Sequence, residues 1–164
     1  MSAEFRKLCA ADLAEFKALR LYALATSPES FGSNYAREAA YSDDKFVHLM
    51  QADEARFILG GFKQGNLVAM MGIMKLDQIS AQIWGVFARP EIRGQGIAKS
   101  LLKRIIATAH ENSKTKYIRL GVTPRSPAAI GLYEKMGFER YEVEAGNDTD
   151  CGAIECEILM KISL

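Results

Sequence analysis

The segment whose residue types best suit a chemical role is Arg93-Gly94-Gln95-Gly96-Ile97-Ala98. Its two glycines let the backbone approach a ligand where a Cβ would collide, and Lys99, Lys103 and Arg104 add positive charge nearby. Apolar residues at helical spacing follow, so the segment opens a helix whose first turn has N–H groups without partners and a partial positive charge. Because such groups bind anions, the segment predicts a phosphate-binding loop.

The spacing of the glycines disfavours two common nucleotide-binding loops. A nucleoside-triphosphate loop has the pattern G-x-x-x-x-G-K-[ST], whereas Ala98 precedes Lys99-Ser100 in this chain. A dinucleotide fingerprint, G-x-G-x-x-G, would need a glycine where this chain has Lys99. A nucleotide-binding switch is therefore disfavoured, and the predicted ligand is another phosphate compound.

The loop lies between a predicted strand and a predicted helix. Residues 82–88 are apolar enough for a buried strand, and Arg89-Pro90 ends it because proline cannot donate to the ladder. The helix that follows has one apolar face at i, i+3, i+4 spacing. That face consists of Leu101, Leu102, Ile105 and Ile106. The order strand, glycine loop, helix places the helix start next to the strand end.

Patterns along the whole chain predict one α/β domain, residues 1–164, with the order β-α-α-β-β-β-α-β-α-β-β. The other predicted strands cover residues 3–8, 55–62, 67–76, 117–122, 138–144 and 153–162. The other predicted helices follow the N-cap residues Asp12, Ser42 and Ser126, with a loop over residues 27–42 between the first two helices. This order predicts a mixed sheet with helices packed against it.

Composition bounds the class of protein. The 164 residues are 49% hydrophobic, which is enough to bury a core without disulfides or a metal. Cys9, Cys151 and Cys156 are odd in number and lack metal-ligand spacing, so we expect reduced thiols, no metal site and a cytoplasmic location. The apolar run from Leu67 to Met74 is far shorter than the roughly 18 residues of a membrane span, so no membrane partner is expected.

Charge is unevenly distributed along the chain. The formal net charge is only +1, which argues against a nucleic-acid partner. Residues 77–137 have ten Lys or Arg against four Asp or Glu, and residues 138–164 have two against seven. The basic excess surrounds the glycine loop, as an anionic ligand would favour. The acidic segment is either a solvated face or the neighbourhood of a cationic substrate.

Two blocks of the chain resemble the GCN5-related N-acetyltransferase (GNAT) family. The loop R-G-Q-G-I-A resembles the family's coenzyme A pyrophosphate loop, [QR]-x-x-G-x-[GA]. Residues 117–138, YIRLGVTPRSPAAIGLYEKMGF, resemble the family's next strand, its following helix with a leucine-tyrosine pair, and the glycine-phenylalanine before another strand. The resemblance implies a mostly antiparallel mixed sheet of about seven strands flanked by about four helices.

The resemblance also implies which residues contact the coenzyme. In the family, the strand before the glycine loop and the strand after the helix splay apart, and the pantetheine arm of the coenzyme fills the gap. By this resemblance Val86, Phe87 and Ala88 contact the pantetheine and the acetyl group. The pyrophosphate contacts are implied for Arg93, Gly94, Gln95, Gly96, Ile97, Ala98 and Lys99. Ser126 stands where many members have a coenzyme-contacting asparagine, and it is the last implied cofactor residue.

Tyr133 is the predicted catalytic acid, because the family often has a tyrosine there that protonates the departing thiolate. With reference pKa values of about 10 for tyrosine and 8.5 for a thiol, full transfer is uphill by about 2 kcal/mol. The alternative role for Tyr133 is packing on the sheet. Gly121 stands where alanine N-acetyltransferases of ribosomal proteins have a glutamate base, so the base must be elsewhere. Glu38 is the first candidate, and Glu29 and Asp77 follow.

The favoured function is an acetyl-CoA-dependent N-acetyltransferase in which an amine attacks the thioester directly. The acetyl donor is acetyl-CoA, and the acceptor is a small-molecule amine or a peptide. Two alternatives stay open: a non-catalytic acyl-CoA-binding sensor or interaction module, and the disfavoured nucleotide switch. A homodimer is common among similar proteins and stays open as well.

Overall fold

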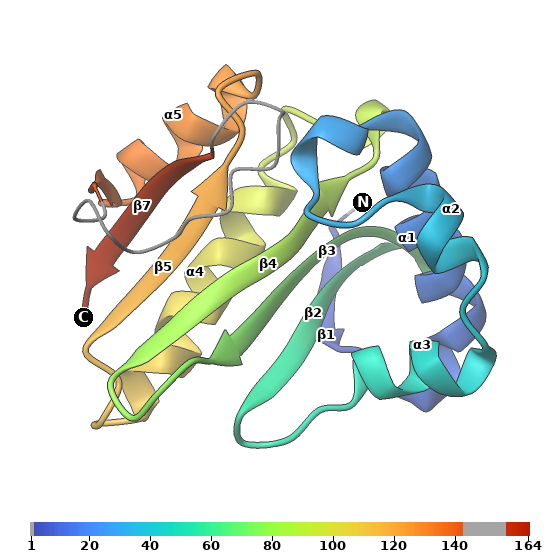
Figure 1. Ribbon diagram of the computed structural model, residues 1–164, viewed down its shortest axis with the longest axis horizontal. Helices are drawn as coiled ribbons and strands as arrows, with labels where there is room; N and C mark the ends of the chain where they lie inside the picture. The colour runs from blue at the N-terminus through green and yellow to red at the C-terminus, as the bar shows by residue number, and fades with distance from the viewer. Residues whose placement is uncertain (1, 143–156) are drawn as a thin grey trace.

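The computed structural model describes residues 2–142 and 157–164 of the chain. Its centre is one sheet of seven strands in the order β1-β2-β3-β4-β5-β7-β6 (Figure 1). The strands are β1 (Glu4–Lys7), β2 (Arg56–Lys63), β3 (Asn66–Lys75), β4 (Ser80–Ala88), β5 (Tyr117–Val122), β6 (Glu139–Arg140) and β7 (Ile158–Ser163). Neighbours are antiparallel except β4 and β5, which run parallel. The predicted mixed, mostly antiparallel sheet is confirmed.

Helices cover both faces of the sheet (Figure 1). In the described residues they are α1 (Leu13–Thr26), α2 (Tyr35–Ala39), α3 (Asp43–Met50), α4 (Ile97–Glu111) and α5 (Pro127–Lys135). The first three lie on one face, and α4 lies on the other face with α5. The short α2 was not predicted, because its five residues are too few for a periodic apolar pattern. The side chain of Asn34 caps it by accepting from the Arg37 amide.

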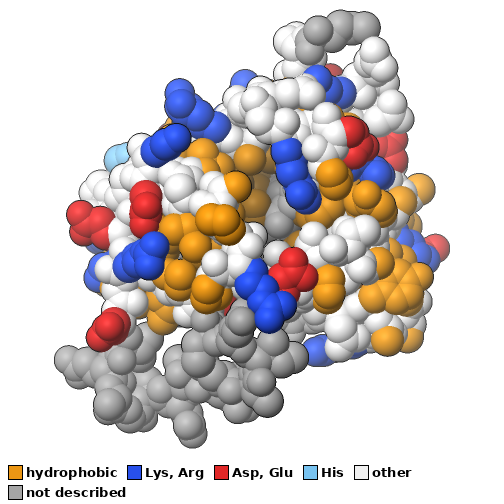
Figure 2. All heavy atoms as spheres, turned by 90° about the horizontal axis from the view of Figure 1, so that it is seen from above, with side chains coloured by type: hydrophobic (Ala, Val, Ile, Leu, Met, Phe, Trp, Pro, Cys, Tyr) orange, Lys and Arg blue, Asp and Glu red, His pale blue; other side chains and the backbone are white. Residues whose placement is uncertain are grey.

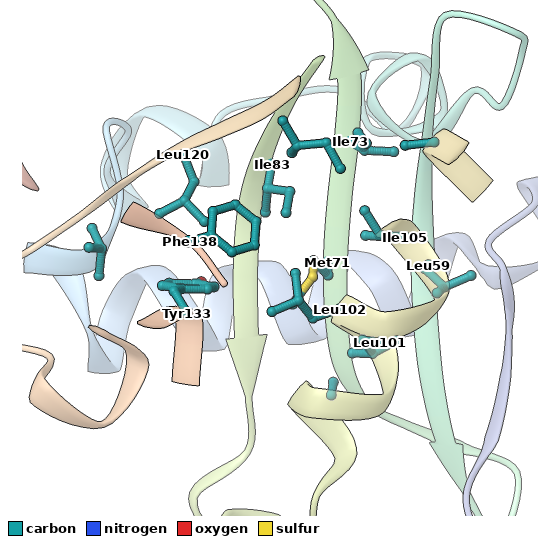
Figure 3. Close-up of a cluster of buried hydrophobic side chains, with 14 of the residues drawn as sticks. Leu59, Met71, Ile73, Ile83, Leu101, Leu102, Ile105, Leu120, Tyr133 and Phe138 are labelled. Atoms are coloured by element: carbon teal, nitrogen blue, oxygen red, sulfur yellow. The ribbon is translucent and has the colours of Figure 1, made fainter. Parts of the chain in front are cut away.

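The larger core fills the space between the sheet and helices α4 and α5 (Figure 3). The predicted apolar face of α4 is in this core, where Leu101, Leu102 and Ile105 are almost completely buried. They pack with side chains of β2 to β5, among them Ile83 and Leu120. Burying each such side chain contributes about 1.5–3 kcal/mol, so this contact fixes where α4 begins relative to the end of β4.

A second core lies on the opposite face, under α1 and α3. Phe16 and Leu19 of α1 and Phe46 of α3 are buried there against β2, β3 and β4. The rings of Phe16 and Phe46 meet edge to face, with centroids 6.3 Å apart. Phe87, at the end of β4, belongs to this core, so the two cores are joined through the sheet close to the glycine loop.

Two of the three predicted helix caps differ from expectation. Ser42 caps α3 as predicted, accepting from the Lys45 amide. Asp12 stands before α1 without capping it, because its carboxylate accepts from the Cys9 amide and from the Arg6 guanidinium at 2.8 Å. These hydrogen bonds with Arg6 lower the pKa of Asp12 to about 2. Ser126 makes no side-chain cap hydrogen bond before α5.

The C-terminal strands form the predicted antiparallel pair, in which Glu139 pairs with Lys161 and Arg140 pairs with Met160. Of the predicted strand 138–144, residues 139 and 140 form β6, whereas residues 143 and 144, like residues 153–156 of the other predicted strand, lie outside the described residues. The predicted loop between the two strands, residues 145–152, lies outside the described residues, as do Cys151 and Cys156.

Within the described ranges, no helix has the length and apolar character needed to cross a bilayer. The same residues contain no group of three His, Cys, Asp or Glu side chains arranged to hold a metal ion.

Candidate active site

The parallel strands β4 and β5 pair over only three residues and then separate. Ser80 to Gln82 pair with Tyr117 to Arg119, and no pairing follows toward the carboxyl ends of the two strands. From residue 83 onward β4 therefore keeps its β3 partner on one side, and no strand of the described residues 2–142 and 157–164 pairs with it on the other. Unpaired backbone N–H and C=O groups in this gap are suited to pair with an extended ligand. This is the splay that the resemblance implied.

A bulge in β4 lies beside this gap. The register between β3 and β4 shifts between Met70 and Gly72, and Gly85 has a φ of +61°, a left-handed conformation that favours glycine. Such a bulge redirects the residues that follow it. After the bulge, the side chains of Val86 and Ala88 therefore lie on the α4 side of the sheet, and the side chain of Phe87 lies on the α1 side.

The three residues predicted to contact the pantetheine therefore differ in what they can offer. Val86 and Ala88 are half-buried, at the edge of the core under α4. The Phe87 side chain is buried among aromatic rings, with the Tyr22 ring centroid at 5.9 Å and that of Phe31 at 6.5 Å. Its side chain thus supports the strand from behind, and only its backbone is placed to meet a ligand in the gap.

The glycine loop forms an open cradle at the start of α4. Gly94 and Gly96 both have a φ of +78°, and Gly96 is the N-cap residue of the helix. A Cβ built on either glycine would have no heavy atom within 4 Å, so the space above both is open. The backbone N–H groups of Ile97, Ala98 and Lys99 lie in the first helical turn, where no intrahelical acceptor exists. Glycines, free amides and helix dipole therefore converge on one anion-sized space, which fits a pyrophosphate.

Side chains hold the loop in this shape. The Arg93 guanidinium donates to the Ala88 carbonyl at 3.0 Å, tying the loop back to the end of β4. Gln95 donates to the Glu91 carbonyl at 3.3 Å, and its amide oxygen accepts from Lys63 at the β2–β3 turn. The predicted cofactor residues Arg93 and Gln95 therefore brace the cradle through their side chains and can meet a phosphate through their backbones.

Ser126 and Tyr133 both belong to α5, which follows β5: Ser126 stands at the N-cap position and Tyr133 lies within the helix. The Ser126 hydroxyl makes no cap hydrogen bond, so it is available to a ligand as a donor or acceptor. Tyr133 is buried against Phe138, with ring centroids 5.7 Å apart, and lies in the core beneath β5 (Figure 3). Burial raises the pKa of Tyr133 to about 12. Its hydroxyl is therefore protonated at neutral pH, as a hydrogen-bond donor to a thiolate must be.

Glu38, the first candidate for the base, is engaged by a buried arginine. Both oxygens of its carboxylate accept from Arg20, at 2.8 Å each. The exposed fractions of the two side chains are 4% for Glu38 and 8% for Arg20. Burial alone would raise the pKa of Glu38, but the hydrogen bonds and charge of Arg20 outweigh it and the pKa is lowered. A carboxylate held in this way is a poor proton acceptor, so the geometry favours a structural role.

Arg20 was not among the predicted functional residues, although its place in the sequence indicates that it is buried. It lies in α1 between the buried residues Leu19 and Ala23, and a charged residue within an apolar helix face indicates a buried partner. Its guanidinium also lies over the Phe31 ring, 5.0 Å from the centroid. Nη1 has no hydrogen-bond partner among the described residues and lies next to Gly85 of the β4 bulge.

The two other predicted acids lie apart from the gap or on the surface. Asp77 accepts from the amides of Ile79 and Ser80 at 2.8 Å, and these hydrogen bonds lower its pKa. It stands before the first residue of β4, about 20 Å along the strand from Val86. Glu29 is exposed in the turn between α1 and α2.

The end of the molecule that carries the gap and the cradle is seen from above in Figure 2. Hydrophobic side chains gather in the middle of this view, and Lys and Arg side chains stand around them. Acidic side chains are fewer among the described atoms of this face. An apolar centre with a basic rim suits a ligand that has an extended arm and a phosphate group.

Comparison with known proteins identifies the family. The model of the acetyltransferase (GNAT) family matches residues 16–138. An uncharacterized N-acetyltransferase of Methanocaldococcus jannaschii is 28% identical over 123 residues, covering 71% of this chain and 53% of that protein. The spermidine N(1)-acetyltransferase of Vibrio cholerae is 30% identical over 93 residues, covering 56% of this chain and 53% of that protein. The chain thus spans about half the length of these two relatives.

The fold agrees with this match. The crystal structure of the PaiA N-acetyltransferase from Thermoplasma acidophilum, in complex with coenzyme A, superposes with a TM-score of 0.76. It is 18% identical in sequence, and the match covers 100% of both chains. Since the family model covers most of the chain, including both strands of the gap, the cradle and Tyr133, the protein belongs to the acetyltransferase (GNAT) family.

Proposed function

We propose that the protein is an acetyl-CoA-dependent N-acetyltransferase that acts on a primary amine. The observation that carries this proposal is the open cradle of Gly94 and Gly96 at the start of α4, beside the unpaired edge of β4. A pyrophosphate on the cradle and an extended arm along the strand edge together describe coenzyme A. Membership of the family supports the same ligand.

Each predicted cofactor residue has a role in this proposal. The backbone groups of Val86 to Ala88 pair with the extended arm, and the amides of Gly94 to Lys99 hold the pyrophosphate. Arg93 and Gln95 keep the cradle in shape through their bonds to backbone carbonyls. Ser126 offers a hydroxyl that does not cap α5.

Acetyl-CoA supplies a thioester, whose carbonyl carbon accepts the amine and whose sulfur leaves. In this proposal a backbone amide of the β4 edge holds the carbonyl oxygen as it gains charge, a contact whose loss costs roughly 10²-fold or more in rate. Tyr133 donates a hydrogen bond to the leaving sulfur. With a pKa of about 12 for Tyr133, full proton transfer to a thiolate of reference pKa about 8.5 is uphill by about 5 kcal/mol. Tyr133 therefore acts as a donor and leaves the proton largely on its own oxygen.

The acceptor is an amine, and spermidine is the first compound to test because one relative is a spermidine N(1)-acetyltransferase. A peptide N-terminus is the second class in this proposal. We also propose a single domain and a cytoplasmic location, supported by one continuous sheet and an exposed free thiol at Cys9. Light scattering of the purified protein tests for a homodimer.

Calorimetric titration with coenzyme A tests the ligand, and thiol release from acetyl-CoA tests the reaction. Gly96→Trp fills the cradle and should abolish binding. The matched control is Gly65→Trp in the β2–β3 turn, which also has a φ of +78° and open space around its Cβ position, so its backbone strain is the same. Equal affinity in both variants would reject the cradle as the site. Binding without thiol release would instead favour the non-catalytic sensor.

A further inference from the structure

A carboxylate occupies the space that Gly121 leaves open at the gap between β4 and β5. A Cβ built on Gly121 would collide with the side chain of Glu157, whose Cδ lies 2.9 Å and whose Cβ lies 3.4 Å from that position. The strand β5 therefore has no side chain of its own at this point. The acid group that covers it comes from the residue directly before β7, 36 residues later in the chain.

The strand register explains how Glu157 reaches this position. Gly121 pairs with Leu159, so Glu157, two residues before Leu159 and directly before β7, is a diagonal neighbour within reach of a long side chain. Leu120 and Val122 belong to the core under α4 and α5, which means that Gly121 faces the other side of the sheet. The carboxylate thus lies on the face opposite α4, where an acceptor can approach the gap without crossing the coenzyme site.

Glu157 differs from Glu38 and Asp77, the two acids first considered as the base, in its hydrogen-bond partners. It is exposed, and among residues 2–142 and 157–164 no hydrogen bond or ion pair involves its carboxylate. Glu38 is bound by Arg20 at both oxygens, and Asp77 is bound by two backbone amides. An exposed carboxylate that no described residue engages can offer its oxygens to an incoming cation.

We propose that Glu157 binds the acceptor ammonium group and receives its proton, and this inference rests on the proposed function. One proton passes from the ammonium nitrogen to the carboxylate, which frees the nitrogen lone pair. The lone pair forms a C–N bond to the thioester carbon, the C–S bond breaks, and the sulfur leaves as a thiolate. A further N–H proton goes to the thiolate, and Glu157 releases its proton to water. The products are an amide, a thiol and one proton.

Charge along the chain supports a cationic acceptor at this position. Residues 138–164, which include Glu157, contain seven acidic against two basic residues, whereas residues 77–137 contain ten basic against four acidic ones. The negative charge of Glu157 would attract a cationic amine, and the basic residues Lys99, Lys103 and Arg104 near the glycine loop would attract the anionic coenzyme. The acceptor class that fits is a primary amine that is protonated in solution.

Glu157→Gln tests the inference, and Glu139→Gln is its matched control, an exposed glutamate on the neighbouring strand β6. Thiol release from acetyl-CoA is measured with spermidine and a panel of primary amines. Glu157→Gln should lower kcat/KM about 10²-fold at pH 7 and leave coenzyme A affinity unchanged. The kcat/KM of Glu157→Gln should then rise about tenfold per pH unit, because this variant can use only the neutral form of the amine. For an amine pKa of about 10.4, the neutral form is about one amine molecule in 2,500 at pH 7. The wild-type profile should be flatter.

Gly121→Ala gives a second and independent test. The added methyl group displaces the Glu157 carboxylate, and a misplacement of about 1 Å costs about 10²-fold in rate. In the Glu157→Gln background the same change should cost nothing further. Equal losses from Gly121→Ala in both backgrounds would show that the carboxylate is not the group displaced, and would overturn the inference.

The outcomes separate this inference from the proposed function. Wild-type turnover with an amine, together with wild-type kcat/KM in Glu157→Gln, would keep the function and overturn the role of Glu157. A loss that is equal at every pH, or a loss of coenzyme affinity, would assign Glu157 a structural role and would also overturn it. Coenzyme binding by the wild type without turnover of any amine would reject the proposed function, and the role of Glu157 with it.

Discussion

Replacing Glu38 by Gln leaves the Arg20 guanidinium buried without its counter-charge. The two side chains are 4% and 8% exposed, and two hydrogen bonds of 2.8 Å join them. Gln keeps the shape, but it removes the negative charge and turns one acceptor oxygen into a donor that faces another donor. Breaking a buried pair in this way costs about 3–5 kcal/mol. Because domains are stable by only about 5–15 kcal/mol, the loss is a large share of the total.

Thermal and denaturant unfolding measure this loss directly. At about 2–4 °C per kcal/mol for a chain of this size, Glu38→Gln should lower Tm by about 6–20 °C. Glu29→Gln, an exposed glutamate in the same connection, should change stability by less than about 0.5 kcal/mol. Replacing both partners, Arg20→Met with Glu38→Leu, should recover most of the loss, since apolar side chains of similar volume need no counter-charge.

The pH dependence follows from the lowered pKa of Glu38. A carboxylate whose pKa is lower in the folded state stabilises that state above the unfolded pKa, which is about 4.3 for Glu. The contribution is lost as pH falls through the lower folded pKa. The stability difference between wild type and Glu38→Gln should therefore be full at pH 7 and should shrink below about pH 4.

Equal Tm values for Glu38→Gln and Glu29→Gln would refute this reasoning. The same variant also tests the earlier prediction that Glu38 is the base. Where Glu38→Gln is still folded, the structural role predicts thiol release close to wild type. A loss of about 10²-fold in folded protein would restore Glu38 as the proton acceptor.

Three further predictions concern other parts of the molecule. Tyr133→Phe should preserve coenzyme A affinity and lower kcat about tenfold to 10²-fold; thiol release equal to wild type would exclude the donor role. Gly72→Ala should lower the free energy of unfolding by about 1–3 kcal/mol, because the new Cβ would lie 2.5–3.0 Å from three ring atoms of Trp84. The control Gly32→Ala, which has open space at this position, should leave the free energy of unfolding unchanged. Similar values for the two variants in denaturant unfolding would contradict this packing. Asp12, with a pKa of about 2, should contribute about 1–2 kcal/mol to the free energy of unfolding above pH 4, and this contribution should be lost as pH falls toward 2. An Asp12→Asn variant whose free energy of unfolding falls with pH as steeply as that of the wild type would contradict this.

The cradle could be predicted from the sequence because all its parts are local. Gly94, Gly96 and the first turn of α4 lie within a few residues of one another, and glycine is the residue type that adopts the left-handed conformation of both positions without a steric penalty. The strand before the loop and the apolar face of α4 were also encoded locally, by an apolar run and by i, i+3, i+4 spacing. These features were predicted correctly for that reason.

Features that depend on distant side chains were missed or placed wrongly. Asp12 has the residue type of an N-cap, but Arg6 and the Cys9 amide take its carboxylate. Glu38 looked like a free acid in a loop, and only tertiary packing brings Arg20 to it from α1. Hydrogen-bond partners of this kind are set by the fold, so residue type alone cannot reveal them.

The contact between Gly121 and the Glu157 side chain is a further feature that the sequence could not predict. The sequence indicated that β5 lacks a side chain at this position, and it could not indicate what fills the space. The register between β5 and β7 supplies the answer, because it sets Glu157 diagonally across from the glycine. Pairing registers between strands far apart in the chain are weakly encoded in the residues themselves.

Thiol release from acetyl-CoA across a panel of primary amines, with coenzyme A binding on the same sample, tests the central claim most directly. We expect the wild-type protein to bind coenzyme A and to release thiol with at least one amine, and we expect Gly96→Trp to do neither. Absence of coenzyme A binding by the wild-type protein, or turnover that survives in Gly96→Trp, would contradict the assignment of the cradle and of the reaction.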